Sequence, residues 1–264
     1  MHDVSDRADG TFCWVGLASS DPGDASRFYT SLFGWRAEDI SVGPMGTCTF
    51  LRHGEKNAAI LYGQTREARL AHAPPHWTSF ILTPDVNASL ERARELGATV
   101  IRAPFDLIDI GRAAALRDPV GAIVSLWQHA PQGGAASDKR DESLAWNELA
   151  TSDIERAKSF YADLFAWEYA TSGAAGYTTI ENRLGPVGGM REHREHEHGL
   201  PSDWLPYFVV ESAEGTVRRA EQLGGVALST ATLDRSVVIT DRQGAAFAVA
   251  EAAEVAKATR RPAR

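Results

Sequence analysis

The chain has 264 residues, of which 44% are hydrophobic and 23% are charged. These fractions are typical of folded globular proteins and exclude a disordered or fibrous chain. The formal net charge of -8 argues against a large basic surface for nucleic acid.

The predicted elements of the first half run in the order strand, helix, strands, and then start again. Residues 14–20 are predicted to form a strand, and Asp21 after them suits a helix N-cap. Apolar residues at helical spacing follow as far as Phe33. Strands are then predicted over 48–52, 58–62 and 78–82, a helix over 86–96 that ends at Gly97, and strands over 99–102, 113–117 and 123–128.

The second half repeats this pattern of predicted strands and helices. The segment from Trp14 to Trp35 recurs from Trp146 to Trp167, with its helix-starting aspartate, aromatic and leucine positions kept. Further along, Trp77 is matched by Trp204 at a shorter spacing. Shorter loops in the second copy explain that drift, because loops tolerate deletions better than helices and strands do.

The repeat predicts two domains, each with two β-α-β-β-β modules. We expect domain 1 over 11–130, a linker over 131–143, domain 2 over 144–252 and a tail over 253–264. The linker is rich in small and charged residues, and the alanine-rich tail is typical of a frayed helix or a disordered end.

Two cysteines, Cys13 and Cys48, are too few for a disulfide framework and form no CxxC motif. The sequence contains no run of about 18 apolar residues, and its N-terminus lacks the apolar core of a signal peptide. We therefore expect a cytoplasmic protein with a small-molecule ligand, and neither nucleic acid nor membrane as a partner.

Several short motifs recur in the same order in both halves. They include the helix segment 153–165, the helix end Glu95-Leu96-Gly97 and the turn over 118–122. Together they resemble the vicinal oxygen chelate superfamily, which contains glyoxalases, bleomycin-resistance proteins and dioxygenases. Three further segments, 146–149, 188–190 and the one with Arg112, resemble a two-domain glyoxalase-like subgroup from actinomycetes.

The resemblance covers about residues 11 to 252 and implies an α+β fold. In that fold four βαβββ modules curl in pairs into two open half-barrel cups. Adjacent pairing of modules and swapped pairing both remain open, as do a monomer and a homodimer. The fold fixes no reaction, because it hosts several chemistries.

Metal-dependent members of the superfamily, by the same resemblance, carry His, Gln or Glu at three positions of a cup. Here those positions hold Trp14, Thr78 and Ser125 in the first domain, and Trp146, Leu205 and Ala248 in the second. These side chains are poor ligands for a divalent ion, so we expect no metal and no cofactor. The run with His193, His196 and His198 could collect a metal, but its mixed charges favour a solvated loop.

Glu148 is the predicted catalytic residue. Alternation along a strand places it on the same face as Trp146, with Asn147 and Leu149 on the other face. A carboxyl group inside an aromatic cup could serve as a general base or as a hydrogen-bonding acid. The first copy has Gly16 there, which would leave room. A structural interpretation, in which Glu148 pairs with an arginine, remains equally open.

The remaining candidates are expected to bind the substrate. Tryptophans could stack on a planar ligand, although such rings are more often core residues. An arginine could clamp an anion or form a salt bridge, and a strand glycine could let a ligand approach the backbone or mark a β-bulge. The candidates are Trp14, Trp77, Trp146, Trp204, Arg112, Ser125, Gly189 and Met190.

The favoured function is a metal-independent enzyme of natural-product metabolism, such as antibiotic biosynthesis. It would act on an aromatic or polyketide-like substrate by acid/base catalysis at Glu148. The alternative is a self-resistance protein that sequesters a drug-like molecule without chemistry. A metal-dependent glyoxalase or dioxygenase is a third possibility.

Overall fold

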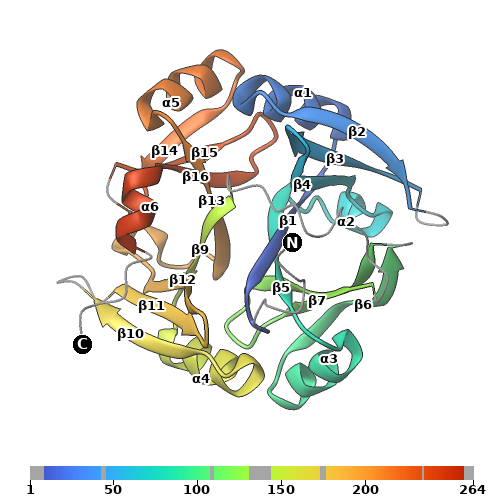
Figure 1. Cartoon of the computed structure of the whole chain (residues 1–264), viewed down its shortest axis with the longest axis vertical. Coiled ribbons are helices and arrows are strands. Elements are labelled where there is room, and N and C mark those ends of the chain that lie inside the picture. Colours follow the sequence, from blue (N-terminus) through green and yellow to red (C-terminus); the bar gives the residue numbers. More distant parts are fainter. Residues whose placement is uncertain are drawn as a thin grey trace.

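The computed structural model describes residues 9–42, 46–107, 110–130, 144–172, 177–233 and 235–258. The predicted linker, 131–143, and the last part of the predicted tail lie outside these residues. Within them the chain forms two eight-stranded sheets, one from each half (Figure 1).

The first half builds one sheet in the order β2-β3-β4-β1-β5-β8-β7-β6. Its elements are β1 (Phe12–Ser19), α1 (Pro22–Phe33), β2 (Arg36–Ser41), β3 (Thr47–His53), β4 (Lys56–Gly63), α2 (Arg66–Leu70), β5 (His76–Leu82), α3 (Val86–Glu95), β6 (Thr99–Leu107), β7 (Gly111–Arg117) and β8 (Ile123–His129).

The second half repeats that order as β10-β11-β12-β9-β13-β16-β15-β14. Its elements are β9 (Leu144–Thr151), α4 (Ile154–Phe165), β10 (Glu168–Ser172), β11 (Tyr177–Asn182), β12 (Gly185–Glu192), η3 (Glu195–Glu197), β13 (Asp203–Val210), α5 (Ala213–Gln222), β14 (Val226–Thr230), β15 (Val237–Thr240), β16 (Ala246–Glu251) and α6 (Ala252–Ala258). The tandem repeat predicted from the sequence is confirmed.

The centre of each sheet decides between the two module pairings that the sequence left open. Strand β1 lies antiparallel to β5, and β9 lies antiparallel to β13. The first module therefore pairs with the second, and the third with the fourth. This confirms the α+β fold with two half-barrel cups, and each cup is built by one contiguous half of the chain.

Local sequence signals explain where the main helices begin and end. The Asp21 carboxylate caps α1 by accepting from the Asp24 N–H, and Asp153 caps α4 in the same way. Helix α1 ends at Gly34 in the left-handed conformation, which glycine adopts easily. Strand β2 was not predicted, because its residues are almost all exposed and show no apolar alternation.

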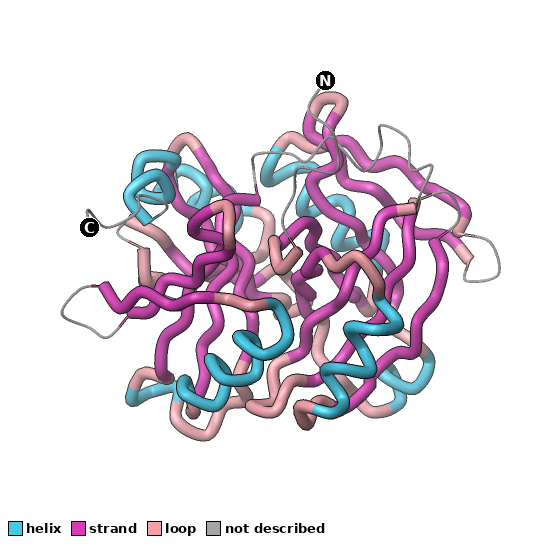
Figure 2. Tube along the Cα trace, turned by 60° about the horizontal axis from the view of Figure 1, so that its bottom comes forward, coloured by secondary structure: helices cyan, strands magenta, loops and turns pink. Residues whose placement is uncertain are grey.

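The back faces of the two sheets pack against each other. Val15 and Leu17, on the back face of β1, share a core cluster with Phe208 and Phe247 of the second half. Helix α1 lies beside α5, and α3 lies beside α4, at opposite ends of this interface (Figures 1 and 2). The concave faces therefore point away from each other, and each has its own cluster of buried side chains.

Two equivalent hydrogen-bonded chains cross this interface. The Trp77 indole donates to the Tyr29 hydroxyl at 3.1 Å, and that hydroxyl donates to Asp241 at 3.0 Å. The other copy repeats this with Trp204, Tyr161 and Asp118, at 2.9 and 2.8 Å. Both tryptophans therefore belong to the core between the halves.

The predicted tail begins with a helix that packs onto the second sheet. In α6, Val255 is buried in one cluster with Trp146 and Tyr207 on the concave face. Among the residues that the structure describes, no helix has the length and apolar character needed to span a membrane.

Candidate functional site

The first cup holds a cavity of about 320 Å³. Six aromatic side chains from different strands form much of its wall: Trp14, Phe50, Tyr62, Phe80, Phe105 and Trp127. They meet there because alternate residues of a strand face the same side of a curled sheet. Such a wall suits a flat, largely apolar guest.

A few polar groups interrupt this aromatic wall. The Arg102 guanidinium lies 3.8 Å from the centre of the Phe105 ring, and Ser125 faces the cavity from β8. Burial raises the pKa of both the Tyr62 hydroxyl and the Cys48 thiol, so both groups are protonated near neutral pH. The described lining residues include no carboxylate and no imidazole.

The floor of the first cup is already occupied at Gly16. A Cβ added there would lie 2.9 Å from the Tyr62 ring and 3.0 Å from the Phe80 ring. The room that Gly16 was expected to provide is therefore taken by its aromatic neighbours. The cavity lies above these rings.

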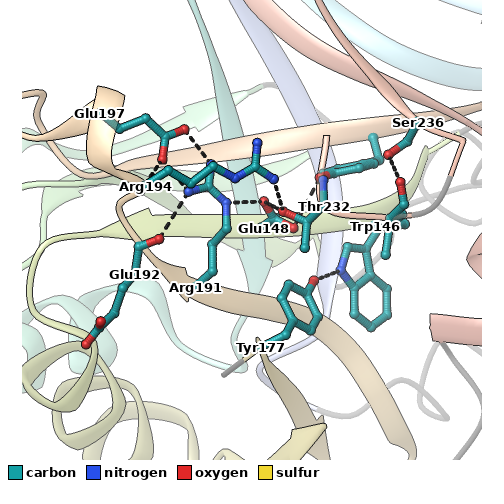
Figure 3. Close-up of polar contacts among 11 residues, drawn as sticks. Trp146, Glu148, Tyr177, Arg191, Glu192, Arg194, Glu197, Thr232 and Ser236 are labelled. Atoms are coloured by element: carbon teal, nitrogen blue, oxygen red, sulfur yellow. Dashed lines mark hydrogen bonds and ion pairs between the residues drawn. The ribbon is translucent and has the colours of Figure 1, made fainter. Parts of the chain in front are cut away.

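The second cup is filled by a hydrogen-bonded cluster around Glu148 (Figure 3). The Glu148 side chain is 1% exposed, and its Oε1 accepts from Arg191 Nε at 2.9 Å and from Thr232 Oγ1 at 2.8 Å. Its other oxygen accepts from the Tyr207 hydroxyl at 3.1 Å. The Glu148 carboxylate is thus ion-paired with Arg191 and fully hydrogen-bonded within the chain. This is the arrangement expected if Glu148 has a structural role. A catalytic role for Glu148 stays a prediction.

Tyr177 fills the space next to this cluster. The Trp146 indole donates to its hydroxyl at 2.9 Å (Figure 3), and a Cβ added to Gly189 would clash with that hydroxyl. The glycine thus makes room for a tyrosine of the same domain. Burial, and then the negative charge of Glu148, raise the pKa of Tyr177 and of Tyr207, so both stay neutral.

The rim of the second cup is held by the charged run that was expected to be a solvated loop. Glu197, in η3, accepts from the Arg191 guanidinium at 2.5 and 2.7 Å and from the Arg194 N–H at 2.7 Å. The Arg194 side chain reaches Thr232 at 3.3 Å. His193, His196 and His198 form no metal-binding group, and the described residues contain no cluster of three or more potential ligands.

This rim predicts a dependence of stability on pH. Burial alone would raise the pKa of Glu197, but hydrogen bonds from Arg191 and Arg194 lower it to about 2, from 4.5. A carboxylate with a lowered folded-state pKa stabilises the fold above its unfolded pKa and loses this contribution as pH falls towards the folded pKa. The contribution of Glu197 should therefore disappear between about pH 4.5 and about pH 2.

Glu197→Gln should lower the midpoint of urea unfolding at neutral pH and flatten its decline in acid. The control is Glu195→Gln, on the same turn, because Glu195 is exposed. Equal pH profiles for the two variants would contradict the role of Glu197 at the rim.

The two cups differ at positions that the strand registers make equivalent. Gly16, Cys48, Tyr62 and Phe80 of the first cup correspond to Glu148, Tyr177, Arg191 and Tyr207 of the second. Each replacement in the second copy adds a polar group that hydrogen-bonds another member of the set or its neighbours. The first cup is therefore largely apolar and contains a cavity, whereas the described residues of the second form a polar, closely packed cluster.

The predicted site residues are spread over several places. Trp14 and Ser125 line the cavity, while Trp146, Glu148 and Gly189 belong to the packed second cup. Trp77, Trp204 and Met190 lie on back faces, in the core between the halves, which differs from the expectation that they line a cup. Arg112 forms a surface ion pair with Asp106 at 2.6 Å instead of facing the cavity.

The cavity wall also contains aromatic residues that were not predicted. Trp127 and Phe80 each lie two residues beyond a predicted cup position, Ser125 and Thr78, so alternation along the strands could have found them. Phe50 and Tyr62 were not found in this way, because no cup position was predicted on their strands, β3 and β4, from which to count.

The donor chemistry does not fit a divalent metal at the three expected positions. In the first cup these positions hold the Trp14 indole and the hydroxyls of Thr78 and Ser125. The Thr78 side chain is already hydrogen-bonded to Tyr62. In the second cup they are Trp146, Leu205 and Ala248, which offer no carboxylate or imidazole.

The sequence is similar to a known protein family and to individual named proteins. A family model described as Glyoxalase/Bleomycin resistance protein/Dioxygenase superfamily matches residues 11–126. The chain is 34% identical to "Putative glyoxylase CFP32" of Mycobacterium tuberculosis, over 93% of this chain and 96% of that protein. It is 32% identical to anthracycline biosynthesis protein DnrV of Streptomyces peucetius, over 94% of this chain and 95% of that protein.

Solved structures share the fold at lower identity. A variant of 4-hydroxymandelate synthase from Streptomyces coelicolor matches with a TM-score of 0.59 and 15% identity, covering 92% of each chain. The 2,3-dioxygenase LapB from Pseudomonas sp. KL28 matches with a TM-score of 0.59 and 11% identity, over 92% of this chain and 93% of that one. At these identities the likeness concerns the fold alone.

Proposed function

Because this chain belongs to the Glyoxalase/Bleomycin resistance protein/Dioxygenase superfamily, we propose that it serves natural-product metabolism by binding a planar aromatic compound in its first cup. The observation that carries the proposal is the open cavity of about 320 Å³ with its aromatic wall. The likeness to anthracycline biosynthesis proteins supports a fused-ring polyketide as the class of ligand.

The proposed binding needs no metal. The first cup offers indole, phenol, thiol and hydroxyl groups where a divalent ion would need carboxylates or imidazoles. Its protonated Tyr62 and Cys48 can donate hydrogen bonds to a ligand oxygen, but neither is a ready base. These groups suit recognition and polarisation of a ligand better than proton abstraction.

A second candidate function is acid/base catalysis at Glu148. The enclosure of its carboxylate by Arg191 and by the neutral Tyr207 hydroxyl resembles a preorganised charged site. Under this alternative the substrate would have to enter the second cup and displace part of the packed cluster.

Blocking the first cup tests the proposed function. Ala115 lines the cavity on β7, and Ala115→Phe should weaken binding of a dihydroxyanthraquinone roughly 10- to 100-fold, because the added ring overpacks the site. Quenching of tryptophan fluorescence measures the affinity, since Trp14 and Trp127 lie in the wall. Dialysis against a chelator should leave the affinity unchanged.

The repeat offers a matched control in Val238, the counterpart of Ala115 in the second cup. Val238→Phe should leave the affinity unchanged; if it is the variant that removes binding, the ligand occupies the other cup. Glu148→Gln separates the two candidates, because it should abolish turnover of a substrate under the catalytic alternative and spare binding under the proposed function.

A further inference from the structure

Ser125 places a hydroxyl group on the wall of the first cup. Ser125 is 5% exposed and lines the cavity from β8, while its neighbours Val124 and Leu126 point into the core between the halves. Within the described parts of the chain its hydroxyl has no hydrogen-bond partner. The four other buried serines, Ser19, Ser79, Ser202 and Ser236, each have a hydrogen-bond partner.

A cavity-facing hydroxyl that no described side chain engages can donate to, or accept from, a molecule inside the cavity. The equivalent residue of the second copy, Ala248, has no such group and is 0% exposed. The hydroxyl is thus present on the wall of the cavity and replaced by a methyl group in the cluster around Glu148. This difference points to a partner that enters the cavity.

We propose that Ser125 is a specificity-determining residue that hydrogen-bonds an oxygen on the inward edge of the aromatic ligand; this rests on the proposed function of the first cup. Serine can both donate and accept, so a phenolic hydroxyl and a quinone carbonyl both fit. Trp14, Phe80 and Trp127 line the same cavity and contact the ring plane. The ligand class is a planar aromatic compound with an oxygen at its leading edge.

The test compares naphthol with naphthalene, which differ only in the hydroxyl group. The wild-type chain should bind naphthol about 2- to 10-fold more tightly, which is the range for one neutral hydrogen bond. Ser125→Ala should remove this preference and leave the affinity for naphthalene unchanged. Ser125→Thr keeps the hydroxyl and should retain the preference, which guards against an effect of repacking.

The control is Ser41→Ala, because Ser41 carries an exposed hydroxyl at the end of β2 and does not line the cavity. It should preserve the preference for naphthol. If wild-type chain binds both compounds and Ser125→Ala keeps the full preference, the role of Ser125 is overturned while the proposed function stands. If neither compound binds the wild-type chain, the proposed function fails, and the role of Ser125 fails with it.

Discussion

Arg191→Met is expected to lower the free energy of unfolding by about 3–5 kcal/mol. The substitution removes the only ion-pair partner of Glu148 in the described structure and leaves a carboxylate that is 1% exposed. The protein cannot hydrate that charge, so the folded state bears the cost of a buried unpaired ion. Urea unfolding at neutral pH measures the effect.

Two further variants serve as a control and as a rescue for this measurement. Arg112→Met breaks an ion pair with Asp106 at the surface, where the side chains are 31% and 70% exposed, and should cost no more than about 1 kcal/mol. Adding Glu148→Leu to Arg191→Met removes the buried charge and should recover much of the loss. A double variant no more stable than Arg191→Met alone would show that the ion pair is not the source of the effect.

Trp204→Ala is expected to cost about 3–5 kcal/mol of folding free energy, through the cavity that it leaves. Trp204 is 1% exposed and packs against Phe12, Tyr161 and Trp167. Its indole also donates to the Tyr161 hydroxyl, which then loses a donor. Thermal and urea unfolding of the purified variant measure the loss.

Trp14→Ala provides the contrast from the cavity wall. Trp14 is only partly buried, so its loss should cost less stability but weaken the binding of aromatic ligands. If Trp204→Ala unfolds like the wild-type chain and loses ligand binding, its ring belongs to a ligand site and not to the core between the halves.

The fold followed from the sequence because its signals are local and occur twice. Asp21 and Asp153 mark the same helix start, and the aromatic positions after them recur in order. The pairing of modules did not follow, because either pairing satisfies the same amphipathic patterns. Edge strand β2 was not predicted, because almost all its side chains are exposed and its sequence lacks apolar alternation.

The candidate site was harder to predict because it depends on contacts between strands. Alternation does place Trp146 and Glu148 on one face, with Asn147 and Leu149 on the other. The same rule, applied to β5 and β13, places Trp77 opposite Thr78 and Trp204 opposite Leu205, so neither tryptophan could share a cup with them. That the second cup is full depends on how far Tyr177 reaches, which residue spacing does not reveal.

The two hydrogen-bonded chains between the halves give both buried faces the same set of interacting groups. Each half offers a tyrosine to the other's aspartate, through Tyr29 with Asp241 and Tyr161 with Asp118. A surface that supplies both members of such a pair is complementary to a copy of itself, as in a symmetric dimer. In a symmetric dimer both cups would have to be identical, because one sequence builds both. When the two copies are joined in one chain, the first cup can change for ligand binding while the second contributes to stability.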